Sequence, residues 1–160
     1  MVAENLAEPT PEISQVLAAN ERFYEAIENA DMDLMRDVWI PTAEGVAAHC
    51  VHPGQSAVHG VSQILRSWAV VLSRMTYLQF FLTDVRVALV GAVAVVTCVE
   101  NVLSNLPGEA AESAGFGGSH YEAVNVFRQV DSGEWRLITH SSAPVFPSGS
   151  ADEAEPGDDR

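Results

Sequence analysis

The feature that most constrains the fold is a change in the spacing of hydrophobic residues near Tyr77. Before this point, apolar residues recur every three to four positions, as on amphipathic helices. After it they alternate every second position, as on strands with one buried face. Helices followed by consecutive strands are typical of an α+β domain, so we expect three N-terminal helices packed on a strongly curved, mostly antiparallel sheet.

Three helices are predicted in the first half of the chain. The first begins at Thr10, which is suited to cap a helix that starts with Pro11. The second covers residues 32–40 and is stopped by Pro41. The third follows Gly60 and continues to residue 75. Its apolar stripe consists of Val61, Ile64, Leu65, Trp68, Leu72 and Met75.

Five strands are predicted, one before the third helix and four after it. They cover residues 46–52, 78–90, 92–104, 120–130 and 134–143. The segment 105–119 has no hydrophobic period and is long for a hairpin loop. It is therefore either a loose connection without a role or a lid that closes through Phe116. His59 and His120 are expected in solvated loops.

One domain is expected at residues 10–146, between a flexible leader at 1–9 and an acidic disordered tail at 147–160. The tail carries five carboxylates and no large apolar side chain, so it cannot offset its ordering entropy by burial. The chain has a net charge of −14 with 8 basic residues, which argues against binding to nucleic acid or to an anionic membrane.

The location predicted for this chain is the cytoplasm. Its first residues lack the basic and apolar regions of a secretion signal, and its apolar runs are too short to span a bilayer. Cys50 and Cys98 both lie in apolar strand patterns, which is typical of buried free thiols.

Four polar side chains interrupt the apolar strand patterns, where an unpaired polar group is costly to bury. They are His52, Glu100, Asn125 and His140. Each imidazole is suited to general acid or base catalysis near neutral pH, or else to a structural hydrogen bond. Glu100 shares its strand face with Cys98. It is a proton carrier if that face lines a pocket, and a rim residue of a dimer interface if it does not.

Several other residues bear on the kind of site that the chain can form. Strand alternation places His49 and His52 on opposite faces, so they do not form a metal site, and no metal or cofactor is expected. Asn20 falls on the apolar stripe of the first helix, where it either hydrogen-bonds to backbone or water or points into a cavity. No nucleophile motif and no phosphate-binding glycine loop is present.

Several segments carry a family resemblance: ANERFYEAIENADMDLMRDVW, VHPG, HG followed by SW, GAVAVVTCVEN and NVFRQVDSGEWRLITHSSAP. With these, the chain resembles the SnoaL-like branch of the nuclear-transport-factor-2-like superfamily, whose cone fold also serves ketosteroid isomerases and limonene epoxide hydrolases. The resemblance implies a conical pocket between the helices and the sheet, and a homodimer formed through the outer sheet face.

Two functions remain open on this basis. The first is binding of a small apolar molecule, with isomerase-like or cyclase-like proton transfer. The second is a non-catalytic binding or dimeric assembly module of the same fold. The catalytic candidates are His52, Glu100 and His140, and the ligand-contacting candidates are Tyr24, Trp39, Trp68 and Asn125.

Overall fold

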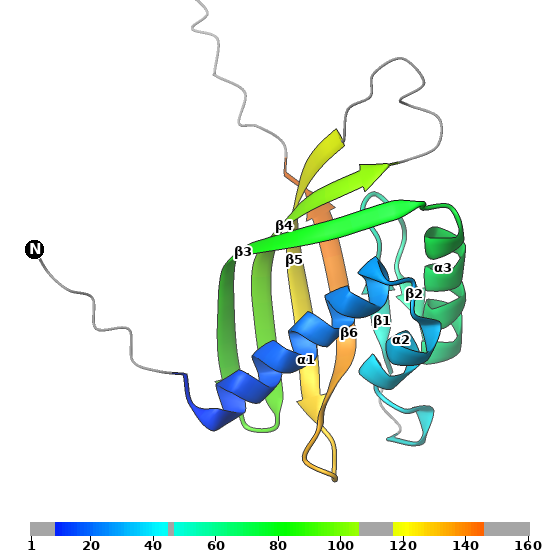
Figure 1. The fold of residues 1–160 in the computed structure, drawn as a ribbon. Coiled ribbons are helices and arrows are strands. Elements are labelled where there is room, and N and C mark those ends of the chain that lie inside the picture. Colours follow the sequence, from blue (N-terminus) through cyan, green and yellow to red (C-terminus); the bar gives the residue numbers. More distant parts are fainter. Residues whose placement is uncertain (1–8, 45–46, 106–116, 146–160) are drawn as a thin grey trace, which may run out of the picture.

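The computed structural model describes residues 9–44, 47–105 and 117–145. The helices are α1 (Pro11–Glu28), α2 (Met32–Val38) and α3 (Val61–Ser73), with a short 3₁₀ turn η1 (Thr42–Glu44) (Figure 1). The strands are β1 (His49–Val51), β2 (Val58–His59), β3 (Tyr77–Val90), β4 (Val93–Asn105), β5 (Gly117–Gln129) and β6 (Trp135–Pro144).

The strands form one six-stranded sheet in the order β2-β1-β6-β5-β4-β3. Within the described residues β1 and β6 pair in parallel and the other neighbours are antiparallel. Register shifts between Thr83 and Arg86 and between Val126 and Phe127 mark β-bulges, which bend strands. The sheet is curved and α1 crosses its concave face (Figure 1), so the α+β cone predicted from the sequence is confirmed.

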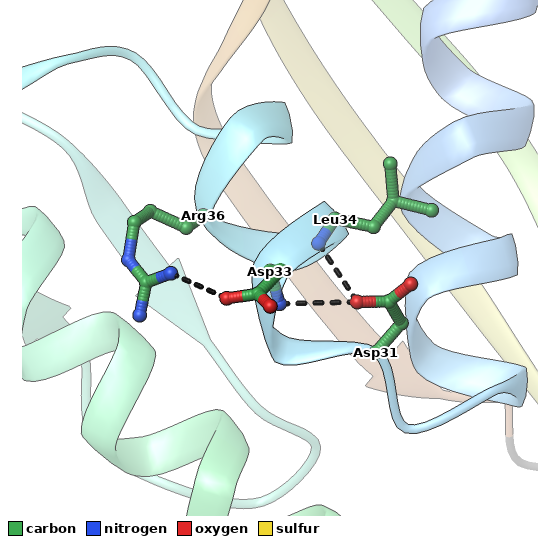
Figure 2. A network of polar contacts seen from close by, with 4 residues as sticks. All are labelled: Asp31, Asp33, Leu34 and Arg36. Atoms are coloured by element: carbon green, nitrogen blue, oxygen red, sulfur yellow. Dashed lines mark hydrogen bonds and ion pairs between the residues drawn. The ribbon is translucent and has the colours of Figure 1, made fainter.

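The beginning of α2 shows how local sequence sets an element boundary (Figure 2). Asp31 Oδ1 accepts hydrogen bonds from the backbone N–H groups of Asp33 and Leu34, at 3.1 and 2.9 Å. These bonds satisfy N–H groups that have no partner inside the helix. Arg36 donates to the Asp33 carboxylate at 2.8 Å, but both side chains are exposed, so this ion pair adds little stability.

The end of α2 differs from the prediction. The helix stops at Val38, two residues before the expected end at Ile40. Trp39 forms an isolated parallel bridge with Leu137 of β6, and the Ile40 N–H donates to the Leu137 carbonyl at 3.0 Å. Pairing with the sheet therefore replaces the last helical turn.

The segment predicted as one strand over 46–52 is shorter and has a partner that the sequence did not reveal. Only His49–Val51 is strand, and Val58–His59 folds back on it as β2. His49 lies directly opposite His59 in this pairing. The expectation that His59 and His120 lie in loops is wrong, because His59 belongs to β2 and His120 to β5.

The core lies between α1 and the concave sheet face. Phe23 is fully buried and meets Trp39 and Trp68 edge-on, at ring-centroid distances of 6.3 and 5.6 Å. Cys50 and Cys98 are buried free thiols. Burial raises the pKa of Cys50 to about 12 and that of Cys98 to about 11, so both stay protonated at neutral pH.

Some sequence predictions fall on parts of the chain that the structure leaves undescribed. The acidic tail, most of the leader, and the interior of the 105–119 segment with Phe116 lie outside the described residues. In the part that is described, no helix is long and apolar enough to cross a membrane.

Candidate functional site

A cavity of about 480 Å³ lies among α1, α3 and the concave face of the sheet. Its size falls in the range of small-molecule sites, which is roughly 300–1,000 Å³. Apolar side chains from α1, α3, β3 and β4 make up much of the wall. The buried polar groups in the lining are His52, Glu100, His140 and Ser142.

Glu100 faces this cavity, which decides the question that strand alternation left open. It is 3% exposed and receives two hydrogen bonds, from the Tyr24 hydroxyl at 2.8 Å and from the Ser142 hydroxyl at 2.6 Å. Burial raises the pKa of Glu100, and the bonds from Ser142 and Tyr24 offset part of that rise. A buried carboxyl of this kind can hold a proton and release it in a reaction.

His140 is held from behind by Asn125 of the neighbouring strand. The Asn125 Nδ2 donates to Asn20 Oδ1 at 2.8 Å and to the Tyr24 hydroxyl at 3.1 Å. Both amide hydrogens are then used, so Asn125 Oδ1 is the acceptor in its 2.6 Å contact with His140 Nδ1. His140 therefore carries its hydrogen on Nδ1, and its Nε2 has no partner among the described residues.

Burial, together with a smaller contribution from the nearby His52, lowers the pKa of His140 to about 3. The ring is therefore neutral at physiological pH, with a free lone pair on Nε2. The side chain lines the cavity while remaining 2% exposed. Such a group can accept a proton or a hydrogen bond from a bound molecule.

His52 is anchored by α3 and not by its own turn. Ser67 donates to the Ile64 carbonyl at 2.7 Å, so its oxygen accepts from His52 Nε2 at 2.9 Å. Burial lowers the pKa of His52, which favours the neutral ring. The imidazole packs edge-on against Trp68 with ring centroids 4.6 Å apart, and Trp68 lies 5.9 Å from His140. One indole therefore contacts both imidazoles.

The predicted ligand-contacting residues do not all reach the cavity. Trp68 lines it, whereas Tyr24 and Asn125 lie behind Glu100 and His140 and hold them in place. Trp39 is 1% exposed and lines a different hollow, of about 450 Å³, between α2 and α3. The structure thus gathers four of the seven site candidates around one cavity, namely His52, Trp68, Glu100 and His140.

Sequence reasoning missed some participants. Asn20, which the apolar stripe had singled out, is 2% exposed and accepts a hydrogen bond from Asn125, a partner 105 positions away that the sequence did not indicate. Ser142 follows His140 by two residues, and strand alternation places both on one face. Nothing in the local sequence singled out Ser67 or the rim residue Arg74.

No group of three or more His, Cys, Asp or Glu side chains suited to a metal ion occurs in the described ranges. His49 does meet another imidazole, with its Nδ1 2.7 Å from that of His59. This pair belongs to the β1–β2 hairpin and does not line the cavity, so it is separate from the site around Glu100.

Comparisons with known proteins give a consistent result. A family model described as a SnoaL-like domain matches residues 16–146. A solved structure from Streptomyces avermitilis, provisionally described as a dehydratase of the NTF2-like family, is 37% identical with a TM-score of 0.75. The match covers 85% of this chain and 97% of that protein. No curated protein matches the chain.

More distant structures share the fold. An NTF2-like superfamily protein from Salmonella enterica serovar Typhimurium matches with a TM-score of 0.71 and 14% identity, over 87% of this chain and 94% of that one. A ketosteroid isomerase-like protein from Erwinia carotovora atroseptica matches with a TM-score of 0.69 and 14% identity, over 87% and 100% of the two chains. At this level of identity the likeness concerns architecture alone.

Proposed function

Because the chain belongs to the SnoaL-like family, we propose that it is an enzyme that transfers protons on a small, largely apolar molecule held in the cavity. One observation carries this proposal. A buried carboxyl with a raised pKa, Glu100, and an unprotonated imidazole nitrogen on His140 line the same cavity. A pair of titratable groups whose environments push their pKa values in opposite directions is the usual arrangement for acid and base.

The proposed chemistry uses both groups in one step. His140 Nε2 takes a proton from a carbon of the ligand, and Glu100 gives its proton to an oxygen of the ligand. Each transfer assists the other, because the Glu100 carboxylate that forms increases the proton affinity of the nearby His140. This coupling allows an imidazole with a low resting pKa to act as a base.

Elimination of water is the form of this chemistry that the Streptomyces relative favours through its description as a dehydratase. The C–H bond breaks and its proton moves to His140. The C–O bond breaks, and the departing hydroxyl takes the Glu100 proton to leave as water, while a C=C bond forms. Proton exchange with solvent then restores both side chains. Isomerisation by the same pair would return the proton to a different ligand atom.

His52 is proposed to orient the ligand. Its Nε2 is fixed by Ser67, which leaves Nδ1 without a hydrogen and free to accept one from a ligand hydroxyl. Its edge-on packing against Trp68 holds the ring in place.

A paired substitution tests the catalytic assignment. The assay is water loss from a panel of apolar β-hydroxycarbonyl compounds, followed by the absorbance of the conjugated product. His140→Asn keeps a donor for Asn125 but removes the base, and Glu100→Gln keeps the shape but removes the transferable proton. We expect each to lower turnover about 10²- to 10⁴-fold.

The control is His120→Asn, which removes an exposed imidazole on β5 that lies outside the cavity. It should retain full turnover, and circular dichroism should show all three variants folded. If His140→Asn and Glu100→Gln remain active while folded, the acid–base pair is assigned wrongly.

A non-catalytic dimeric module remains the second candidate, and one observation favours the dimer. The outer face of the sheet exposes large apolar side chains, including Phe81 at 53%, Val90 at 73% and Val124 at 40%. Exposed apolar patches of this kind commonly mark interfaces. We propose that a second copy of the chain covers this face, which sedimentation equilibrium would test. A ligand-binding dimer without turnover would favour the module over the enzyme.

A further inference from the structure

We propose that the molecule bound in the cavity is an organic anion, with its apolar body inside and its carboxylate or comparable group at the rim on Arg74. This inference deepens the proposed function and depends on the same cavity. It adds the charge of the ligand and the direction in which the ligand enters.

The position of Arg74 follows from the geometry of α3. Ser67, Val71 and Arg74 are spaced by four and three residues, so they lie along one side of the helix. All three line the cavity. Arg74 is the C-terminal cap residue of α3 and is exposed, whereas Trp68 on the same wall is 5% exposed. The helix therefore places an aromatic surface deep in the cavity and a guanidinium at its opening.

Arg74 has no side-chain ion pair or hydrogen bond within the described part of the chain. Other arginines do: Arg36, Arg86 and Arg136 each contact a carboxylate on the surface. A guanidinium presents a planar set of donors that suits a carboxylate in a two-point contact. At Arg74 those donors remain available to a ligand.

The charges around the cavity point the same way. The other titratable groups that face it are His52, Glu100, Tyr121 and His140. Burial favours the uncharged forms of His52, Glu100 and His140. The guanidinium is thus the one permanent charge among the described lining residues, and it lies at the exposed end.

The net negative charge of the protein makes a local cation such as Arg74 important for binding an anion. The chain carries a net charge of −14, so its general field repels anions. A ligand with an anionic end would need a local cation at the opening, and it could not place that end beside Glu100 without a desolvation cost. The carbon that reacts near His140 would therefore lie at the end of the ligand remote from its anionic group.

Two fluorescent probes that differ by one sulfonate test the inference. They are 8-anilinonaphthalene-1-sulfonate, which is anionic, and N-phenyl-1-naphthylamine, which has the same ring system without charge. Both brighten in apolar sites, so their dissociation constants can be titrated directly. We expect Arg74→Gln to weaken binding of the sulfonate about five- to twenty-fold, the range between an exposed and a desolvated charge pair. Binding of the neutral probe should change less than about two-fold, since it makes no charge pair.

Arg66→Gln is the matched control. It removes the same charge from the same helix, but Arg66 is exposed and does not line the cavity. Binding of both probes should stay within about two-fold of the unsubstituted protein, and added salt should reduce the effect of Arg74. Equal losses in the two variants would show a general effect of net charge and would overturn the inference.

The remaining outcomes separate this inference from the proposed function. If both probes bind and Arg74→Gln weakens neither or both alike, Arg74 serves only to cap α3 and the ligand is not selected for charge. The acid–base proposal would then still stand. If neither probe binds, the cavity does not accept apolar molecules of this size, which counts against both proposals. Loss of turnover in Glu100→Gln with an unchanged sulfonate preference would support both.

Discussion

The two faces of the central strands invert the usual distribution of polarity in opposite ways. Asn125 on the inner face of β5 is completely buried, while its neighbour Val124 on the outer face is 40% exposed. On β4, Glu100 is buried and Val99 is only partly buried. Helix α1 covers the inner face, and no described segment covers the outer one (Figure 1). The buried polar residues suit a face that surrounds a cavity, and the exposed apolar residues suit a face that contacts another surface.

Polar side chains can be buried on the inner face because their polar atoms have hydrogen-bond partners. Asn125 serves three groups at once: His140, Asn20 and Tyr24. Buried polar networks stabilise a structure only when their members are satisfied, and removal of one member leaves the others unpaired. The polar contacts of the outer face, such as those of Asn101 with Thr83 and His120, are exposed to solvent. The same kind of substitution should therefore have very different consequences on the two faces.

Truncation of the two adjacent residues should give the largest contrast. Asn125→Ala removes the partner of the His140 N–H and of the Asn20 oxygen, so we expect a loss of about 3–5 kcal/mol in the free energy of unfolding. Val124→Ala removes two methyl groups that are already partly in water and should cost less than about 1 kcal/mol. Urea denaturation followed by circular dichroism measures both.

Similar losses in the two variants would contradict the comparison. A small loss in Asn125→Ala would mean that water replaces the amide, and that the network does not depend on it. A large loss in Val124→Ala would mean that the outer face is covered and contributes to the folded unit in the same way as the inner face.

The sequence specified the elements of this fold better than it specified their contacts. Period and capping residues predicted the three helices and the four long strands, because these signals are local. The pairing of β1 with β6 and the short β2 were not visible, since they depend on where distant segments meet. Trp39 illustrates the limit, because its helical spacing says nothing of its bridge to Leu137.

The site was predicted only in part, because it too depends on where distant segments meet. Strand alternation placed Glu100 on the face of Cys98 but could not say which face the helices cover. The answer depends on Tyr24 in α1, 76 positions away, and on Ser142 in β6. The bulge at Val126 and Phe127 also shifts the register of β6, which simple alternation from Trp135 would have missed. His140 lies opposite Asn125 only because of that shift.

Lowering the pH should reduce the free energy of unfolding through His140 on the inner face. Its pKa is about 3 in the folded chain against about 6.5 when unfolded, so between these values the unfolded state binds more protons. Stability is then fully present above pH 6.5 and falls as the pH drops, by up to about 1.4 kcal/mol per pH unit. Glu100 acts in the opposite sense, because its raised pKa stabilises the fold below pH 4.5 and that contribution is lost at higher pH.

The two contributions can be separated by urea midpoints measured from pH 4 to 7. His140→Asn should flatten the loss of stability on the acid side, and Glu100→Gln should steepen it. His120→Asn controls for the loss of an imidazole on the outer face. An unchanged slope in His140→Asn would show that the pKa of the ring is the same in the folded and unfolded chain, which would contradict the lowered pKa of the buried ring.

The smallest expected change in folding concerns the outer face itself. Phe81 lies opposite Asn101 on β4 and is 53% exposed, so Phe81→Ser should lower the stability of a single chain by less than about 1 kcal/mol. The same substitution should raise the dissociation constant of the proposed dimer at least about tenfold, because it removes a large aromatic side chain from the interface. Unfolding of dilute protein measures the first quantity and sedimentation equilibrium measures the second.

A loss of several kcal/mol in dilute protein would place Phe81 in the core of the single chain. If the unsubstituted protein stays monomeric at about 100 μM, a concentration far above the Kd of typical stable dimers, a second copy does not cover this face.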